Sequence, residues 1–358
     1  MTNAAEQYLF TPGPVKIPTD ILALGAMQTP YFRNQAFSEV VFECEKNLLA
    51  LTNAPEGSRA IFITASGTAA MEAVVLNLLD TQEQCIVING GTFGQRFVDI
   101  CHLHQRPIFN VKVSNTNLAN TDSLENFQTA SALLVNGHET SIGLLYDLHA
   151  LGNFCLTHGM LHIVDAISMF VTDELDMQKC AIDALILSSH KGLALPPGLA
   201  MVVLSPKALR RIKHAQTYYL NFKNHLEDGL RGQTPFTPAV TIILQLQLRL
   251  AQLMAQGLAH QQQRAKAIAE YFRAAIKPLP LKTYSAYMPN ALTALSPTDS
   301  RKASEIVAAL EHQYHVVVAP NGGELKDTLF RVAHMGDIDE AYTDVLINAL
   351  FNYYQVTR

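Results

Sequence analysis

The chain has 358 residues, of which 49% are hydrophobic and only 16% charged, and its formal net charge is −5. This length predicts two closely associated domains, and the apolar composition favours either a large buried sheet or an apolar subunit interface. The acidic charge and the scattered Lys and Arg residues argue against binding to nucleic acid or to an anionic membrane.

Short apolar runs alternate with helical patterns through the first 204 residues. The candidate strands are residues 60–63, 85–88, 108–113, 132–135, 161–164, 184–187 and 200–204. Most of the intervening stretches are long enough for crossover helices, for example 68–79 and 148–158. Apolar strands separated by helices predict an α/β fold with a mostly parallel, seven-stranded sheet that is covered on both faces. The strand at 200–204 follows its predecessor after only a loop, so we expect it to pair antiparallel.

The second half of the chain changes character. Residues 241–276 are rich in Leu, Gln and Ala and predict one long helix that leads out of the first domain. A smaller α/β unit follows, with strands at 291–295, 316–319 and 329–332 and a helix at 304–314. The last helix begins near Ile338, with Asp337 and Asp339 as candidate N-caps.

These elements suggest three parts of the chain. Residues 1–20 form an N-terminal segment that we expect beside the small domain or the active-site entrance. Residues 21–255 form the large domain, and residues 256–358 form the small C-terminal domain.

Lys191 follows the strand at 184–187, at the edge where parallel sheets place ligands. A lysine at a strand end is most often a surface residue. The apolar residues on both sides of Lys191 favour another interpretation, because loss of solvation lowers the pKa of the amine and makes it nucleophilic.

Asp165 ends the strand that precedes the lysine strand. An aspartate there can cap a helix or bind Mg²⁺. Beside a lysine that carries pyridoxal phosphate (PLP), it has a third task, because a carboxylate next to the pyridine nitrogen keeps that nitrogen protonated.

Ser66, Gly67 and Thr68 lie between the strand at 60–63 and a strong helical pattern. Small hydroxylated residues at a helix start expose backbone N–H groups to an anion such as phosphate. The same residues also serve as ordinary N-caps. The segment lacks the lysine of a P-loop, and no GxGxxG motif is present, which argues against the usual nucleotide sites.

In this order, these features resemble the class V aminotransferases of PLP fold type I, with alanine–glyoxylate, serine–pyruvate and 2-aminoethylphosphonate aminotransferases as the most similar members. The resemblance extends over nearly the whole chain and comprises seven segments. They are LFTPGP (9–14), SGTAAMEA (66–73), GTFGQRFVD (91–99), HETSIG (138–143), VDAIS (164–168), HK (190–191) and FRVAHMG (330–336).

The resemblance implies a role for each matching residue around PLP. Lys191 matches the lysine that forms the Schiff base, and Asp165 matches the partner of the pyridinium nitrogen. Phe93, often Trp in relatives, matches the ring that stacks on the cofactor, and Ile167 matches the apolar contact on its other face. The remaining matches are Thr140 near the phenolic oxygen, and Ser66, Gly67, Thr68 and His190 near the phosphate.

Three further matches lie outside this group. Arg331 matches the arginine that holds the substrate carboxylate, a role for which the guanidinium fork is well suited. Arg33 lies where relatives place residues near the substrate entrance. Thr237 matches a residue that reaches the phosphate from a second subunit, which implies a homodimer with shared sites. Relatives often carry Tyr near position 234, so Thr234 departs from their pattern.

The implied function is ping-pong transfer of an amino group from a small amino acid, of the alanine or serine type, to glyoxylate or pyruvate. An alternative is 2-aminoethylphosphonate–pyruvate transamination, because a phosphonate also suits an arginine. A cysteine desulfurase is disfavoured, since no cysteine follows Cys180. A non-catalytic PLP fold is disfavoured because Lys191, Asp165 and Arg331 occur together.

The remaining sequence properties favour a cytoplasmic protein. No apolar stretch reaches about 18 residues, the length that suggests a membrane-spanning helix. Residues 1–8 lack the cationic and apolar regions of a signal peptide. The five cysteines form an odd set without a CxxC pair, and Cys85 and Cys155 lie in apolar segments as core residues do.

Overall fold

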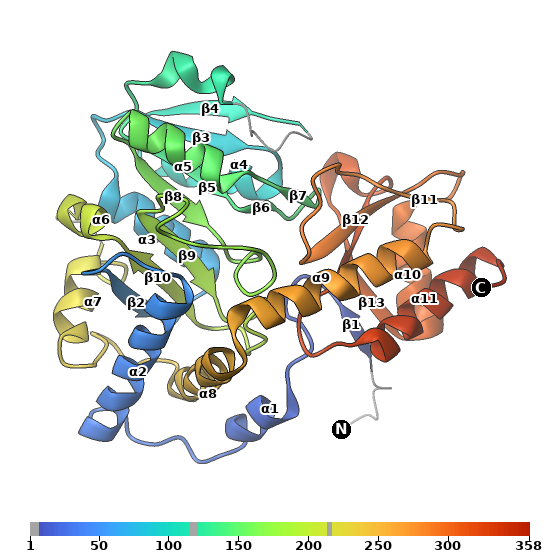
Figure 1. The fold of residues 1–358 in the computed structure, drawn as a ribbon, viewed down its shortest axis with the longest axis horizontal. Helices are drawn as coiled ribbons and strands as arrows, with labels where there is room; N and C mark the ends of the chain where they lie inside the picture. The colour runs from blue at the N-terminus through green and yellow to red at the C-terminus, as the bar shows by residue number, and fades with distance from the viewer. Residues whose placement is uncertain (1–6, 115–120, 213–216) are drawn as a thin grey trace.

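The computed structural model describes residues 7–114, 121–212 and 217–358. It contains a large α/β domain and a smaller one, and helix α9 (Leu258–Ala275) extends from the first toward the second (Figure 1). Among the described residues, no helix is both long and apolar enough to cross a bilayer. The same residues include no group of three or more His, Cys, Asp or Glu side chains placed to hold a metal ion.

The large domain is built on a seven-stranded sheet, as the sequence predicted. Its spatial order is β2 (Arg59–Ile63), β10 (Ala200–Leu204), β9 (Ala184–Ser188), β8 (Leu161–Asp165), β5 (Ala132–Asn136), β3 (Cys85–Asn89) and β4 (Ile108–Lys112). Strands β9, β8, β5, β3 and β4 pair in parallel. Strand β10 is antiparallel to both of its neighbours, which confirms the expectation from its short connection.

Two apolar cores enclose this sheet because successive strand residues point to opposite faces. In β3, Ile86 and Ile88 belong to one core and Cys85 and Val87 to the other. Helices α2 (Gln35–Leu51), α5 (Leu148–Thr157) and α8 (Val240–Gln256) contribute to the first core. Helices α3 (Gly67–Leu78), α4 (Thr92–Leu103), α6 (Pro206–Arg211) and α7 (Phe222–Gly229) contribute to the second.

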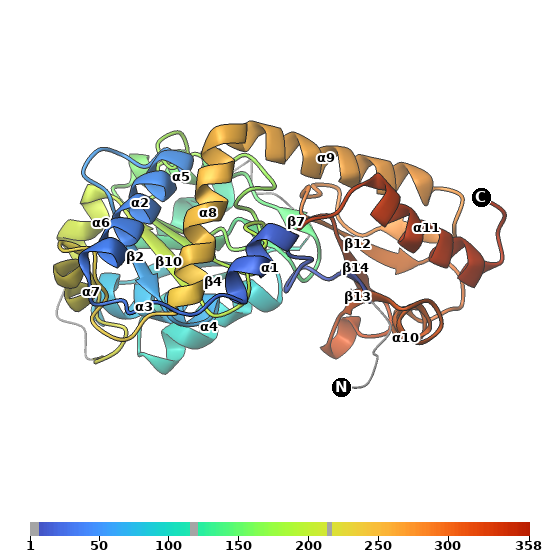
Figure 2. The ribbon, with the colours of Figure 1, turned by 90° about the horizontal axis from the view of Figure 1, so that it is seen from below.

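The prediction of a single helix over residues 241–276 is wrong, because the helix is interrupted at one position. Helix α8 ends at Gln256 and α9 begins at Leu258, with Gly257 between them at a φ of 85°. Glycine adopts this positive φ without a steric penalty, whereas other residues do so at a cost. The two helices therefore run in different directions (Figure 2), α8 along the large domain and α9 over the small one.

The small domain contains a five-stranded sheet whose first strand comes from the N-terminus. The order is β1 (Tyr8–Phe10), β13 (Val316–Pro320), β14 (Phe330–Ala333), β12 (Leu292–Pro297) and β11 (Leu281–Thr283). Strand β1 is parallel to β13, and the other pairs are antiparallel. Helices α9, α10 (Ala303–Tyr314) and α11 (Glu340–Tyr354) pack on this sheet around a core that includes Phe10, Phe272 and Phe330.

The structure shows which of the two candidate aspartates is the N-cap of the last helix. Asp339 accepts a hydrogen bond from the Tyr342 N–H at 2.7 Å and precedes α11. Asp337 instead lies 3.5 Å from the Lys16 ammonium. The remaining described elements are short: α1 (Thr19–Gly25), the hairpin β6 (His138–Glu139) and β7 (Leu144–Leu145), and 3-10 turns at Asp122–Phe127 and Gly323–Leu325.

Candidate active site

One pocket gathers every residue that the sequence placed against the cofactor except Thr237. It lies where the carboxyl ends of β8, β9, β5 and β3 meet the turn after β2, the edge at which open α/β sheets bind ligands. Its lining comprises Ser66, Gly67, Thr68, Phe93, Arg96, Thr140, Asp165, Ile167, Ser168, His190 and Lys191.

Asp165 is held rigidly at the base of this pocket. Its carboxylate accepts hydrogen bonds from Asn136 Nδ2 at 2.6 Å and from the Ile167 N–H at 2.9 Å. Burial raises the pKa of Asp165, while these hydrogen bonds and the positive charge of Lys191 partly oppose the rise. A buried carboxylate of this kind is stabilised by a cationic partner, such as a protonated ring nitrogen.

Lys191 follows β9 and is only 9% exposed. Burial lowers the pKa of its ammonium group to about 8; Asp165 opposes this shift, whereas the positive charges of Arg331 and Arg96 add to it. Because its pKa lies about one unit above neutrality, roughly a tenth of Lys191 is a neutral, nucleophilic amine at pH 7, far more than for an ordinary lysine.

The turn after β2 offers unpaired N–H groups to an anion. Ser66 precedes α3 and makes no side-chain hydrogen bond to the helix. The Ala69 N–H donates to the Ser66 carbonyl, which leaves the N–H groups of Gly67 and Thr68 available. An ideal Cβ at Gly67 would lie 2.3 Å from Ile167 Cδ1, so only glycine lets this backbone approach so closely. Thr68 Oγ1 accepts a hydrogen bond from Arg96 Nη1 at 2.9 Å.

Phe93 and Arg96 lie one turn apart on α4, and the sequence reasoning missed Arg96. The Arg96 guanidinium lies 4.8 Å from the centre of the Phe93 ring, within the range of a cation–π contact. The buried Glu139 carboxylate fixes the start of this helix by accepting from the N–H groups of Phe93 and Gly94, at 3.3 and 2.9 Å. The spacing of three residues between Phe93 and Arg96 was the available signal, because it places both on one helix face.

Ser168 is the second lining residue that sequence reasoning missed. Its Oγ lies 2.8 Å from Thr140 Oγ1 across the pocket wall. On the other side, His190 Nδ1 lies 2.9 Å from Ser188 Oγ. Burial, together with the positive charge of Lys191, lowers the pKa of His190 to about 4, so its ring is neutral at physiological pH.

Arg331 reaches this region from β14 of the small domain. Its Nη2 donates to the Pro320 carbonyl at 2.6 Å and its Nη1 to the Thr140 carbonyl at 3.4 Å. Its Nε is buried without a hydrogen-bond partner. The guanidinium is thus tethered beside the pocket and keeps a donor unused.

The structure of one chain does not bring Arg33 or Thr237 into the pocket. Arg33 Nη1 donates to the Thr234 carbonyl at 2.8 Å and to Gln233 Oε1 at 3.3 Å, so it supports the segment before α8. Thr237 is exposed at the end of that segment.

Comparison with known proteins agrees with this geometry. The family model for class V aminotransferases matches residues 25–322. This chain belongs to the class V aminotransferase family.

The relatives of this class V aminotransferase match it along most of their length. The chain is 28% identical over 353 residues to the soluble hydrogenase small subunit of a Synechococcus species, covering 96% of this chain and 91% of the relative. It is 25% identical over 349 residues to the L-aspartate–glyoxylate aminotransferase of Paracoccus denitrificans, covering 93% and 87%. The structure of alanine–glyoxylate aminotransferase from Nostoc superposes with a TM-score of 0.90 at 22% identity, covering 98% and 96%.

The chain is thus a PLP-dependent transaminase of fold type I, and the residues in the pocket suit this cofactor. PLP presents an aldehyde, a pyridine nitrogen, a phenolic oxygen and a phosphate. The pocket offers a nucleophilic amine at Lys191, a buried carboxylate at Asp165 and free helix N–H groups after Ser66.

Proposed function

We propose that this class V aminotransferase moves an amino group from a small amino acid, of the alanine or serine type, to glyoxylate or pyruvate. The observation that carries the proposal is the convergence of Lys191, Asp165 and the Ser66–Thr68 turn on one pocket, with Arg331 beside it. The relatives support the acceptor, because several of them are named as glyoxylate aminotransferases.

Each part of the pocket has a separate task toward PLP. Lys191 Nζ would hold it covalently, and Asp165 would keep a proton on its ring nitrogen. Phe93 and Ile167 would contact its two faces. The phosphate would lie against Ser66, Gly67, Thr68 and His190, with Arg96 contributing positive charge. When bound, PLP supplies an electron sink that stabilises negative charge at the substrate Cα.

Lys191 is also the group that moves the proton. As a neutral amine, Lys191 Nζ would take the proton from the substrate Cα and deliver it to C4′ of the cofactor. The lowered pKa of Lys191 suits this task, because a general base works best when its pKa lies near the working pH.

Arg331 would bind the substrate carboxylate. Its guanidinium is held at the pocket edge by two backbone carbonyls, and its Nε lacks a partner. A carboxylate that accepts from this side of the fork would gain charge-assisted hydrogen bonds. Small substrates are favoured because Arg331 donates to the Thr140 carbonyl, so a carboxylate bound to it would lie close to the residues that line the pocket.

The test is a donor–acceptor panel with purified protein. Alanine, serine and 2-aminoethylphosphonate serve as donors, each with glyoxylate or pyruvate as acceptor. We expect alanine or serine, added without an acceptor, to change the cofactor absorbance, and we expect glyoxylate to restore it. The proposal fails if none of the small amino acids changes the spectrum, and a response to 2-aminoethylphosphonate only would assign that substrate instead.

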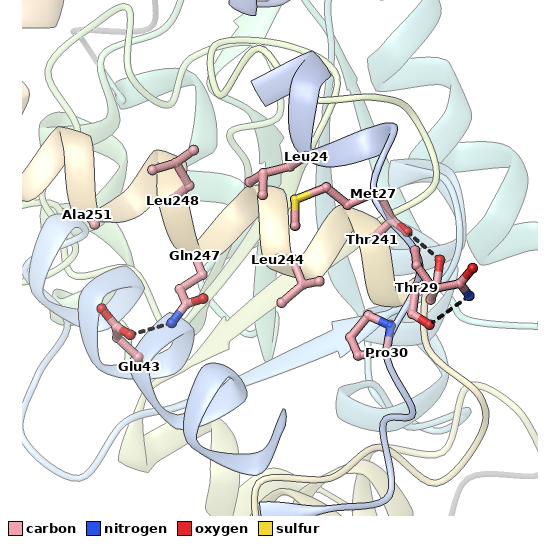
Figure 3. Close-up of a pocket in the computed structure, with 11 residues that line it drawn as sticks. Leu24, Met27, Thr29, Pro30, Glu43, Thr241, Leu244, Gln247, Leu248 and Ala251 are labelled. Carbon is pink, nitrogen blue, oxygen red and sulfur yellow. Dashed lines mark hydrogen bonds between the residues drawn. The ribbon is translucent and has the colours of Figure 1, made fainter. Parts of the chain in front are cut away.

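A homodimer that completes each site is the second part of the proposal. An apolar groove between α1, α2 and α8 includes Leu24, Met27, Leu244 and Leu248, and its side chains point into one open hollow (Figure 3). Met27 is 64% exposed in this groove, and contiguous exposed apolar surface is typical of interaction sites. We assign this groove to a second copy of the chain.

The position of Thr237 supports a second copy as the occupant. Thr237 lies directly before α8, whose first turns contribute Thr241 and Leu244 to the groove. A copy bound there would carry its own Thr237 along the same interface. Met27→Glu should therefore give monomers by light scattering and weaken PLP binding. If the Met27→Glu variant remained a dimer, this face would be excluded as the subunit interface.

The cytoplasm is the proposed compartment. All five cysteines are free thiols. Free thiols are typical of a reducing compartment.

A further inference from the structure

A second, smaller cavity lies where the two domains meet. Its lining includes Val171, Gly192, Arg249, Arg264 and His334, none of which lines the pocket around Lys191. The centre of a water-sized particle has ≈ 20 Å³ of space in it, which is room for one small ion. Ligand sites often lie at such domain boundaries, and the charges around this cavity show which ligand would fit.

Arg249, on α8, is a buried cation without a carboxylate in contact. It is 9% exposed, and it donates from Nε to the Leu193 carbonyl at 3.2 Å and from Nη1 to Gln252 Oε1 at 3.5 Å. Of the described carboxylates, Asp20 and Asp337 act on Arg249 through their charge, but neither forms an ion pair with it. A guanidinium stays protonated in proteins, and a charge buried in this way needs an anion beside it.

Arg264, near the start of α9, brings a second positive charge to the same cavity. Its Nη2 donates to the Ile338 carbonyl at 2.7 Å and lies 4.0 Å from Asp337 Oδ1. Asp337 also pairs with Lys16 at 3.5 Å, so its charge is shared. Burial and then the positive charge of Arg264 lower the pKa of Arg249. The two guanidinium groups therefore repel each other, and an anion between them would relieve the repulsion.

His334 adds an uncharged polar group to the lining. It is 1% exposed, and its Nδ1 is buried without a hydrogen-bond partner among the described residues. Burial and the charge of Arg273 hold the pKa of His334 well below its ordinary value, so the ring is neutral. Thr293 Oγ1 accepts from Arg273 Nε at 2.8 Å and lies 2.7 Å from His334 Nε2. The Thr293 proton is thus available to Nε2, which favours the tautomer with a proton on Nδ1.

The cavity also adjoins both sides of the active site. Gly192 directly follows Lys191, and His334 follows β14, the strand that carries Arg331. An ideal Cβ at Gly192 would lie 2.2 Å from the carbonyl oxygen of the residue before Val171. Val171 itself has a φ of 79°, an outlier for a β-branched residue. Strained backbone of this kind gathers at functional sites, and an ion bound here would bear on the turn after Lys191.

We propose that this cavity binds one small monovalent anion, chloride or a carboxylate as small as formate, between the guanidinium groups of Arg249 and Arg264. The ion would join α8 to α9 and would hold the small domain against the turn after Lys191. This site is separate from the one proposed for the substrate carboxylate at Arg331. The inference goes beyond the proposed function and does not depend on which substrates are used.

The first test is thermal unfolding of the PLP-loaded protein in chloride and in gluconate at equal ionic strength. Gluconate carries the same charge but is too large for the cavity. Chloride at about 100 mM that binds with a Kd of about 10 mM favours the folded protein roughly tenfold, which raises the melting midpoint by about 1–3 °C. Equal midpoints in chloride, formate and gluconate would overturn the inference. An increase in formate alone would support the site and assign a carboxylate as its anion.

Variants connect the effect to the cavity. Arg249→Gln and Arg264→Gln should each abolish the difference between chloride and gluconate. The Arg264 side chain is 38% exposed, so this second variant should fold even where the buried Arg249 does not tolerate replacement. Arg59→Gln is the matched control, because Arg59 is partly buried and has its own carboxylate, Glu45, at 2.7 Å. The control should keep the full chloride effect. An undiminished effect in Arg264→Gln would contradict the assignment.

A crystal structure of the wild-type protein grown in bromide locates the ion without any variant. Bromide has the charge of chloride and scatters anomalously. We expect an anomalous peak in contact with both Arg249 and Arg264. A water molecule at that position, or bromide bound only elsewhere on the protein, would refute the proposal. Neither result would bear on the proposed function, which depends on Lys191 and the PLP pocket.

Discussion

Gly67 packs directly against Ile167, so that the start of α3 and the turn after β8 are in van der Waals contact. Gly67→Ala would place a methyl group 2.3 Å from Ile167 Cδ1. Overpacking of this kind costs about 1–3 kcal/mol, and we expect a loss of PLP affinity of roughly tenfold to a hundredfold. Fluorescence titration with PLP measures it. Gly322→Ala is the control, because that position has open space and a φ of −115°.

The capture of PLP by the cofactor-free protein should depend on the ionisation of Lys191. Because the neutral amine is the nucleophile, the rate should increase as the pH rises through about 8, the lowered pKa of this lysine. Stopped-flow absorbance at a series of pH values gives the profile. A rate that is flat between pH 6 and pH 9 would contradict a buried, titrating amine.

Two charge changes should move that profile in opposite directions. Arg331→Gln removes a positive charge that lowers the pKa of Lys191, so the midpoint should move to higher pH. Asp165→Asn removes the negative charge that raises the pKa, so the midpoint should move to lower pH. The same stopped-flow measurement tests both variants, and equal shifts in one direction would exclude this electrostatic account.

Removal of the Lys191 amine should abolish covalent attachment without unfolding the protein. Lys191→Ala removes both the anchor and the proton-transfer group, so we expect activity to fall by about 10²–10⁴-fold or more. The mass of the borohydride-reduced protein reports the adduct. Lys266→Ala is a suitable control, because the Lys266 side chain is 52% exposed and pairs with Glu270 on its own helix.

Gly257→Ala tests the bend between α8 and α9. Apart from its immediate neighbours, no atom of the described residues lies within 4 Å of a Cβ at this position, so the penalty comes from the positive φ of 85°. Strain of this kind costs about 1–3 kcal/mol, and chemical denaturation should show a loss of that size. A variant as stable as the wild type would mean that the helices re-orient freely at this junction.

Much of the fold and of the site was predictable because both depend on local patterns. Apolar runs of about five residues identified the seven strands of the large sheet, and Lys191 and Asp165 were recognisable at strand ends. The bend at Gly257 was not predictable, because one glycine within a Leu-rich and Gln-rich segment is weak evidence that a helix is interrupted.

The parts of the site that were missed depend on tertiary contacts. Arg96 and Ser168 acquire their place from the packing of α4 and of the turn after β8, which no linear motif describes. Arg33 illustrates the converse case. Its side chain binds carbonyl groups of residues 234 and 235, about 200 positions further along the chain.

Strand β1 connects the beginning of the chain to its end. Tyr8 pairs with Val316 in the small sheet, yet α1 and α2, which follow at once, pack against α8 of the large domain. During synthesis, β1 therefore emerges about 300 residues before its partner strand β13 and must wait for it. Removal of β1 would thus perturb the small domain, and would leave the edge of β13 open to pairing with other chains.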